Sequence, residues 1–584
     1  MAVPPGIAYL TRSFLPLLCL GVLVYWAFDG IQRCAALSVT PWIRLAAAVI
    51  TPPLVYVCRG SFATFKNKRD AAAMGAVVVP AVQESFFSIV RGIRNSIKNG
   101  YPGDIYLKWS TEYGQTFILN LFAEHQVVTM EPEHIKAVLA TQFQDFEKGP
   151  FAIAALGSLL GAGVFNSDGD MWKFHRDMSR PFFNKDRIAD FDNFERHAVS
   201  TISHIKARLG EGFPIDFQDV VARFTLDSAT EFLFGKDVES ITAGLPYPAD
   251  SPLANSPHFV NHPSNLFIKA FSRGMELIAS RVQGGGTWPL IEFWKDKVQS
   301  NREAVDRFIQ PVLAKALDKK SKGIEIESDE ETMSLLDLLV RSTNDPKVIQ
   351  DELVNVLVAG RDTTASLLTF AMYMMCEHPE MAQRLRAEIL EKVGTRQPTY
   401  ADIRDMKYLR AFLNETLRLY PVVPVNDRTA KAATTLPNKG RAPYFIPKRT
   451  RVAYSVFLMH RRTDLWGPDA LEFDPDRFLD SRLYKYLTPN PFIFVPFNAG
   501  PRICLGQQFA YNESSYYLIR FLQTFSSFSL AMDAQPAEGI PPANWTEMPG
   551  TTKGREKIML GFHLTLYAKA GLWIRMKEVN EEIQ

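Results

Sequence analysis

A cysteine lies in a glycine- and proline-containing turn near the C-terminal end of the chain, in the segment Phe497-Asn-Ala-Gly-Pro-Arg-Ile-Cys504-Leu-Gly506. Gly500 can adopt a positive φ in a tight turn, and Gly506 leaves room for a flat group to approach the backbone. A helical pattern begins at Gln507, so Cys504 lies just before a helix N-terminus, where N–H groups and the helix dipole favour a thiolate. The segment therefore predicts a cysteine that is positioned as a metal ligand.

Four further residues around Cys504 complete a recognisable pattern. Phe497, Gly500, Arg502, Cys504 and Gly506 match F-x-x-G-x-R-x-C-x-G without departure, and the segment resembles the haem-binding signature of the cytochrome P450 superfamily. The resemblance implies haem (heme, iron protoporphyrin IX) with Cys504 as its axial thiolate ligand. It also places Phe497, Gly500 and Arg502 in the cofactor-binding loop, and the fixed charge of Arg502 suits a haem propionate. A thiolate on haem iron assists O–O bond cleavage.

A polar motif interrupts the long apolar helical segment Ile349 to Met375. Glycine inside a helix lowers its stability by roughly 1 kcal/mol relative to alanine, so Gly360 is expected to serve packing or function. Ala359, Gly360 and Thr363 share a helix face, and we expect the small residues to open a groove beside the Thr363 hydroxyl, which can bond back to the Ala359 carbonyl. The motif resembles the P450 distal sequence A-G-x-D/E-T. The resemblance implies that Asp362 and Thr363 deliver protons to iron-bound dioxygen.

Two motifs between the distal motif and the cysteine loop indicate a buried ionic network. Glu415 and Arg418 share a helix face at i, i+3 and resemble the P450 E-x-x-R motif. Asp474-Pro-Asp-Arg-Phe478 resembles the P-x-R-F segment of the same superfamily. The resemblance implies that Arg477 joins Glu415 and Arg418 in a structural network around the haem loop.

Three more side chains are candidate partners of the haem propionates. Trp172 and Arg176 match W-x-x-x-R, share one helix face and can both donate hydrogen bonds to a carboxylate. Arg428, shortly after Pro424, is a further candidate, with an ordinary surface arginine as the alternative.

The N-terminal region is apolar in two stretches. Residues 13–28 carry no charge, and about 16 residues are slightly fewer than the roughly 20 that span a bilayer. A second stretch, residues 35–58, leaves open whether the chain has one span or two. We therefore expect a membrane anchor at residues 1–60, a linker or amphipathic region at 61–100, and a P450 catalytic domain at 101–584.

The charges that flank these stretches predict an orientation. Arg12 is the only charged residue in residues 1–12, whereas Arg59, Lys66, Lys68 and Arg69 follow the second stretch. The positive-inside rule then places the C-terminal part in the cytosol. For a membrane-bound eukaryotic P450, the resemblance implies the endoplasmic reticulum membrane.

Hydrophobic patterning predicts a mainly α protein with a smaller β region, and the resemblance implies that this is the P450 fold. Residues 117–122 and 126–130 read as a β-hairpin, helical periodicity extends to Leu419, and residues 451–457 are again β-like. The sheet is therefore expected to take strands from both ends of the domain. Lys plus Arg number 65 against 63 Asp plus Glu, which gives no electrostatic case for nucleic-acid binding.

Several stretches, at 224–235, 419–429 and 459–469, resemble fungal membrane-bound alkane and fatty-acid hydroxylases, including those of basidiomycetes. The resemblance implies a long-chain alkane or fatty acid, or an aromatic or terpenoid xenobiotic or secondary metabolite. Apolar candidate pocket residues such as Val422 and Val425 also favour a hydrophobic substrate.

No flavin- or iron–sulfur-binding region is recognised in the sequence, so electrons must come from another protein. The resemblance implies NADPH-cytochrome P450 reductase, with cytochrome b5 as a further candidate. Two alternatives stay open: a haem-thiolate isomerase or peroxygenase, which needs no proton relay like Asp362-Thr363, and a non-enzymatic haem sensor.

Overall fold

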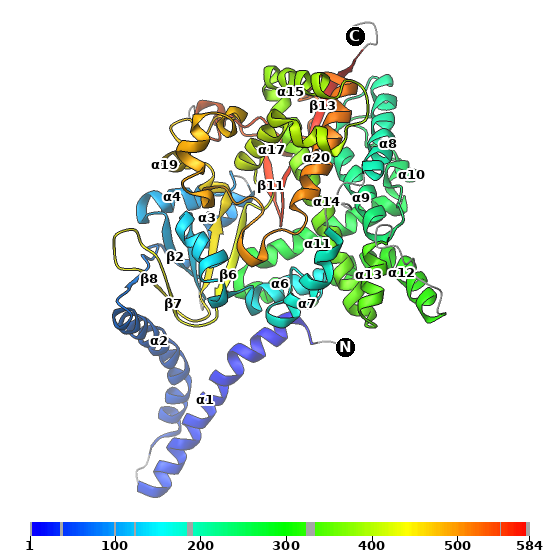
Figure 1. Cartoon of the computed structure of the whole chain (residues 1–584). Helices are drawn as coiled ribbons and strands as arrows, with labels where there is room; N and C mark the ends of the chain where they lie inside the picture. The colour runs from blue at the N-terminus through cyan, green and yellow to red at the C-terminus, as the bar shows by residue number, and fades with distance from the viewer. Residues whose placement is uncertain are drawn as a thin grey trace.

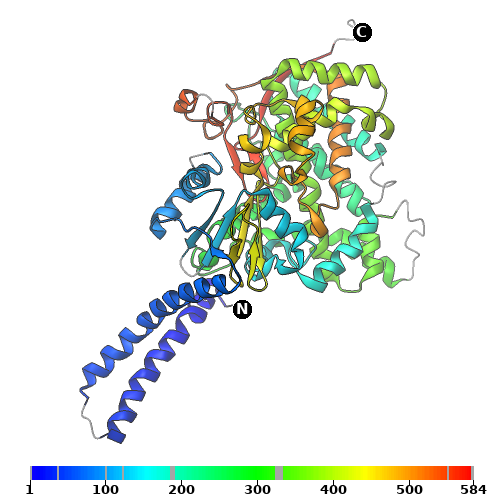
Figure 2. The ribbon, with the colours of Figure 1, turned by 60° about the vertical axis from the view of Figure 1, so that its left-hand side comes forward.

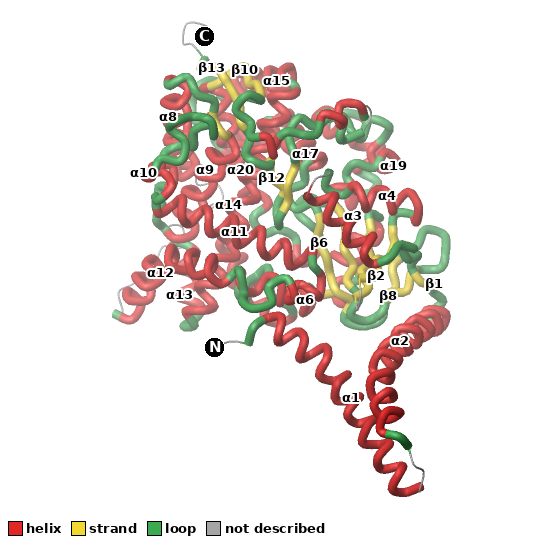
Figure 3. Tube along the Cα trace, turned by 180° about the vertical axis from the view of Figure 1, so that it is seen from behind, coloured by secondary structure: helices red, strands yellow, loops and turns green. Residues whose placement is uncertain are grey.

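The computed structural model describes residues 3–35, 39–98, 101–121, 124–183, 191–322, 333–548 and 551–579. Helices make up most of this part, while β2, β6, β7 and β8 lie on one side of the domain and β10 and β13 lie apart from them, near α15 (Figures 1 and 3). The predicted mainly α architecture with a smaller β region is confirmed.

The elements are numbered in chain order. The helices are α1 Pro5–Ala35, α2 Pro41–Ala73, α3 Phe86–Lys98, α4 Asp104–Tyr113, α5 Pro132–Lys136, α6 Gly149–Leu160, α7 Gly169–Ser179, α8 Phe191–Gly210, α9 Phe217–Phe234, α10 Pro257–Val260, α11 Pro263–Gln283, α12 Gln299–Ser321, α13 Leu335–Ser342, α14 Pro346–Glu377, α15 Pro379–Lys392, α16 Tyr400–Asp405, α17 Lys407–Leu419, α18 Val456–Met459, α19 Thr463–Trp466 and α20 Gln507–Thr524. The strands are β1 Val77–Val78, β2 Thr116–Leu121, β3 Glu124–Thr129, β4 Phe146–Glu147, β5 Ile215–Asp216, β6 Val425–Ala430, β7 Thr434–Leu436, β8 Tyr444–Ile446, β9 Arg451–Ser455, β10 Phe525–Leu530, β11 Leu560–Phe562, β12 Leu566–Ala568 and β13 Trp573–Glu578.

The largest sheet joins distant parts of the chain in the order β2-β3-β9-β6-β4. The predicted hairpin is the antiparallel pair β2 and β3, and its connection at residues 122–123 lies outside the described residues. β3 pairs in parallel with β9, with Gln126 opposite Arg451. The expectation that strands from both ends of the domain share a sheet is therefore confirmed.

The long helix α14 forms the centre of the helical part. Its residues are buried on most sides, and it packs closely against α9. The Thr225 hydroxyl of α9 donates to the Arg361 carbonyl at 3.0 Å. A Cβ at Gly360 would lie 3.2 Å from the Cβ of Ala229, tighter than ordinary packing. Gly360 therefore allows the close approach of α9, and the groove expected beside Thr363 stays a prediction.

The N-terminal helices α1 and α2 pack against each other and project from the domain as a hairpin (Figures 1 and 2). Both are long and apolar enough to cross a membrane, and their surfaces are almost entirely exposed. Arg44, which interrupts the second apolar stretch, donates to Asp29 at 2.8 Å, so each charge compensates the other. α2 continues to Ala73, beyond the boundary expected at residue 60.

A buried ion pair connects α17 to the segment that leads to the cysteine loop. Arg418 donates to both carboxylate oxygens of Glu415, at 2.6 and 2.8 Å, and Arg477 lies 3.5 Å from the same carboxylate. Arg418 also donates to the carbonyls of His460, at 2.8 Å, and Ala470, at 2.6 Å. All the donors of this pair are thus used inside the protein, which offsets the cost of burying the charges.

His460 extends this network to the cysteine loop. Burial, together with the nearby Arg418 charge, lowers the pKa of His460 to about 3, so the ring is neutral. Its Nε2 accepts from the Val495 N–H at 3.2 Å, and Nδ1 therefore carries the proton and donates to the Arg418 carbonyl at 3.1 Å. The backbone two residues before Phe497 is fixed in this way.

We expect Glu415→Ala to lower the free energy of unfolding by about 3–5 kcal/mol, because two arginines would remain buried without their carboxylate. Thermal unfolding of the haem-loaded protein measures the loss. The control is Arg384→Ala, which removes an ion pair with Asp476 whose two side chains are exposed and should cost at most about 1 kcal/mol. An equal loss of unfolding free energy in the two variants would show that the buried pair stabilises the fold no more than an exposed pair does.

Candidate active site

Two residues with left-handed backbone shape the cysteine loop. Asn498 has φ 60° and Gly500 has φ 67°. A Cβ at Gly500 would lie 1.9 Å from the Leu139 carbonyl oxygen, so only glycine fits. The Cys504 N–H donates to the Phe497 carbonyl at 3.0 Å, and the Asn498 side chain accepts from the Tyr454 hydroxyl at 2.9 Å. These bonds set the position of the cysteine relative to the sheet.

Cys504 is surrounded by protein without being fully covered. Its side chain has solvent-accessible surface, yet enough protein surrounds it for burial to raise the pKa of the thiol. The Gly506 N–H and the Arg176 charge act in the opposite direction but do not outweigh burial. Our expectation that the helix N-terminus favours the thiolate is thus only partly met. A bound metal ion supplies the missing charge, because a coordinating thiol loses its proton.

A group of cations lies close together beside the cysteine loop. Arg502 donates to Asp168 at 2.7 Å and to the Ser167 carbonyl at 3.1 Å. Burial lowers the pKa of Arg502 to about 10, and the nearby positive charges of Arg428 and Arg176 add to this effect. Repulsion between buried cations is unfavourable unless an anion lies among them.

Arg428 is not a surface residue, because only 3% of its area is exposed. One guanidinium nitrogen donates to the Asp427 carbonyl at 2.6 Å and the Asn426 side chain at 3.1 Å. Its Nε has no partner within the described part of the chain. A buried donor without an acceptor is costly, which indicates that an anionic group completes this site.

Lys148 is a fourth cation that sequence reasoning missed. Burial, followed by repulsion from Arg428, lowers the pKa of Lys148 to about 8, and Arg502 contributes in the same direction. Lys148 lies in the short turn between β4 and α6, and no motif or spacing marks it. Asp168 and Asp427 compensate only part of the positive charge, and Asp427 also binds Arg451 at 2.7 Å. Two haem propionates fit this arrangement.

Trp172 and Arg176 of α7 both contact the cysteine loop. Arg176 donates to the Ile503 carbonyl at 3.1 Å. The guanidinium carbon of Arg502 lies 4.4 Å from the centre of a Trp172 ring, and that of Arg176 lies 5.9 Å from it. Trp172 thus packs between two of the arginines by cation–π contact.

The distal motif lies on α14, which packs against α20 behind the cysteine loop. The Thr363 hydroxyl donates to the Ala359 carbonyl at 2.5 Å, as predicted from the spacing. Asp362 accepts from Arg361 at 2.7 Å. A hydroxyl bonded back to its own helix is a donor that can be released without disturbing the fold.

A buried carboxyl, also missed from the sequence, links three helices beside this motif. Glu513 of α20 is fully buried and accepts from Ser228 of α9 at 2.7 Å, while its second oxygen has no partner among the described residues. Burial raises the pKa of Glu513 to about 8, against the lowering effect of the Ser228 hydrogen bond and of the nearby Thr364 hydroxyl of α14. The carboxyl is therefore neutral in the fold at pH 7.

The raised pKa of Glu513 predicts a pH-dependent stability. The unfolded chain ionises this carboxyl above its ordinary value of 4.5, whereas the folded protein keeps the proton up to about pH 8. Stability should therefore fall as pH rises through this window, by about 1.4 kcal/mol per pH unit. Thermal unfolding should show that the stability of Glu513→Gln falls less steeply between pH 5 and pH 8 than that of the wild type. Glu547→Gln, which changes an exposed carboxyl, is the control and should keep the wild-type slope. Parallel slopes in all three proteins would contradict the neutral state of Glu513.

Comparison with known proteins agrees with this geometry. The cytochrome P450 family model matches residues 88–544. Cytochrome P450 monooxygenase himC of Aspergillus japonicus is 36% identical over 472 residues, which cover 80% of this chain and 76% of the relative. Cytochrome P450 52A3-A of Candida maltosa is 39% identical over 426 residues, or 70% and 77% of the two chains. Cytochrome P450 52A6 of Candida tropicalis is 40% identical over 434 residues, or 72% and 79%. With its cysteine loop, its buried cations and this similarity over most of its length, the chain belongs to the cytochrome P450 family.

Proposed function

We propose that this P450 monooxygenase inserts one oxygen atom from O2 into a hydrophobic organic substrate. The observation that carries the proposal is the Cys504 loop, where Arg176 lies close to the thiol and Arg502 lies close to Arg176 and Arg428. When bound, a haem with a thiolate ligand activates dioxygen for insertion into a C–H bond. The protein supplies the ligand, the charges that orient the group, and proton donors on α14.

Long-chain alkanes or fatty acids are the first substrates to test, followed by aromatic and terpenoid compounds. The motifs shared with fungal alkane and fatty-acid hydroxylases support this choice. Asn426 and Asp427 are engaged by arginines, whereas the neighbouring side chains Val422 and Val425 are free of polar groups. Apolar side chains at these positions suit a substrate without charged groups near its reacting carbon.

Asp362 and Thr363 are assigned to proton delivery. Thr363 Oγ1 holds a proton toward the Ala359 carbonyl and can turn it toward a reacting oxygen. Asp362 accepts a hydrogen bond from Arg361. Once Asp362 leaves this partner, it can pass a new proton to Thr363. Such a relay separates productive oxygen transfer from release of peroxide.

Electrons come from NADPH-cytochrome P450 reductase, and cytochrome b5 is a second candidate donor. We place the protein in the endoplasmic reticulum membrane, with its catalytic domain in the cytosol. The hairpin of α1 and α2 supports this topology, because α1 begins and α2 ends beside the domain (Figure 2). The basic residues after the second apolar stretch favour the cytosolic side for that end.

The thiolate assignment predicts a specific loss in Cys504→Ser. The difference spectrum of the reduced, CO-bound full-length protein should show the Soret band of thiolate-ligated haem in the wild type and lose it in the variant. Cys376→Ser, which changes a cysteine in α14, should keep the band. A wild-type band typical of a neutral ligand, in folded and haem-loaded protein, would refute the monooxygenase proposal and favour a haem sensor.

Thr363→Ala should keep haem but uncouple oxygen transfer. With reductase, NADPH and a fatty-acid or alkane substrate, we expect product per NADPH to fall by roughly tenfold or more, with peroxide formed instead. Thr369→Ala is the matched control, because Thr369 makes the same kind of bond to the Ala365 carbonyl, at 2.7 Å. Full coupling in Thr363→Ala would overturn the proton role, and turnover of hydroperoxides without reductase would identify an isomerase or peroxygenase.

A further inference from the structure

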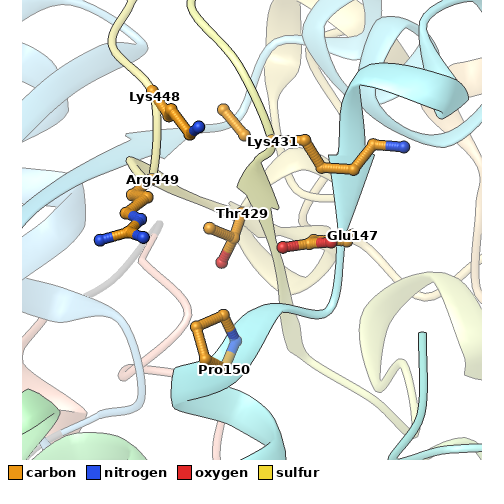
Figure 4. Close-up of a pocket in the computed structure, with 7 residues that line it drawn as sticks. Glu147, Pro150, Thr429, Lys431, Lys448 and Arg449 are labelled. Atoms are coloured by element: carbon orange, nitrogen blue, oxygen red, sulfur yellow. The ribbon is translucent and has the colours of Figure 1, made fainter. Parts of the chain in front are cut away.

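A second group of cations surrounds a pocket at the surface, away from Cys504. The pocket has a volume of about 480 Å³ and is lined by Glu147, Pro150, Thr429, Ala430, Lys431, Lys448 and Arg449 (Figure 4). We propose that this basic pocket, formed around Lys431, Lys448 and Arg449, binds the phosphate headgroup of an anionic phospholipid.

The pocket has an excess of positive charge that the protein does not neutralise. Lys431, Lys448 and Arg449 face a single carboxylate, that of Glu147. Within the described ranges of the chain, none of the three cations has an ion pair or a side-chain hydrogen bond. Figure 4 shows Lys448 and Arg449 on one side of Thr429, and Lys431 extending on the other side above Glu147. Unpaired ammonium and guanidinium groups around one cavity are suited to a phosphate.

One of these cations, Arg449, has an unfavourable backbone conformation that hydrogen bonds maintain. Arg449 has φ 66°, a conformation in which glycine is usual. It occupies the third position of a turn that closes through the Thr450 N–H and the Pro447 carbonyl at 3.2 Å, where type II turns favour glycine. The Arg449 N–H also donates to the Ala430 carbonyl at 2.8 Å, which joins the turn to the strand end beside Lys431. A non-glycine residue with a left-handed backbone is found most often at functional sites.

The pocket lies on the side of the domain from which α1 and α2 project, which the proposed topology turns toward the membrane. Its residues come from β4, β6, the start of α6 and the turn between β8 and β9, and Figures 1 and 3 show β6, β8 and α6 on the side from which α1 and α2 project. Trp294 and Ile291 are exposed in the segment that contacts the start of α1. Val77 and Val78 are exposed just after the end of α2. Tryptophan and aliphatic side chains at this level are typical of the membrane interface.

This placement favours a lipid headgroup over a soluble anion. A phosphate in the surface of a bilayer that holds α1 and α2 is always at high local concentration near the pocket. Anionic lipids are enriched in the cytoplasmic leaflet, where the proposed topology puts the domain. The inference rests on that topology but not on catalysis, so its test does not need turnover.

Lipid retention by the full-length, haem-loaded protein tests the proposal. The protein is purified from detergent micelles that contain equal amounts of phosphatidylcholine and phosphatidic acid, and the lipids that stay bound are extracted and counted. We expect phosphatidic acid to be enriched over phosphatidylcholine in the wild type. Lys431→Gln/Lys448→Gln/Arg449→Gln should reduce the retained phosphatidic acid at least fivefold.

A charge-matched control separates the pocket from general electrostatics. Lys392→Gln/Arg404→Gln/Lys485→Gln removes three exposed cations outside the pocket and should leave retention unchanged. Equal retention in the wild type and the pocket variant would overturn the proposal. Displacement of the lipid by the same concentration of inorganic phosphate would also overturn it, because the pocket would then be a site for soluble anions.

Arg449→Gly gives a second readout that a damaged fold would not reproduce. Glycine removes the charge and also relieves the left-handed backbone. We expect retention of phosphatidic acid to fall while the thermal unfolding midpoint stays the same or rises. A lower midpoint together with lower retention would mean that Arg449 is structural, and the lipid assignment would fail at this residue.

Discussion

The buried ion pair between Glu415 and Arg418 is the interaction on which the rest of the site depends. Arg418 uses its remaining donors on carbonyls of the segment that follows β9, and neutral His460 transfers this constraint to the backbone before Phe497. Charges buried so deeply are tolerable only because every donor is directed at a fixed acceptor. The network therefore fixes the loop that carries Cys504 before any cofactor is present.

The cations around that loop have the opposite character, because the protein leaves them incompletely compensated. Arg502 is held by Asp168, but the guanidinium of Arg428 keeps an unpaired nitrogen, and Lys148 loses basicity among its neighbours. An isolated chain would be destabilised by this arrangement. A dianionic group that binds among these cations supplies the negative charge that the chain lacks. Haem binding and folding of this region therefore stabilise each other.

A second excess of positive charge lies on the side of the domain from which α1 and α2 project. There the cations are exposed and surround a pocket at the surface, close to the ends of α1 and α2. Interior arginines near Cys504 suit a cofactor that is permanently enclosed, whereas Lys431, Lys448 and Arg449 suit a ligand that exchanges with the bilayer. Lys148 and Pro150 stand two residues apart in the turn into α6, so this short segment takes part in both environments.

The sequence by itself determined the helix-rich fold, the hairpin β2–β3, the cysteine loop and the back-bonded Thr363, because each depends on local backbone preference or on side chains a few residues apart. Only the tertiary structure decided that Gly360 accommodates Ala229, that burial outweighs the helix end at Cys504, and that Arg428 lies inside. It alone revealed Lys148 and Glu513, whose surroundings come from segments distant in sequence. Desolvation and charge repulsion depend on which segments meet in space, and no spacing along the chain encodes them.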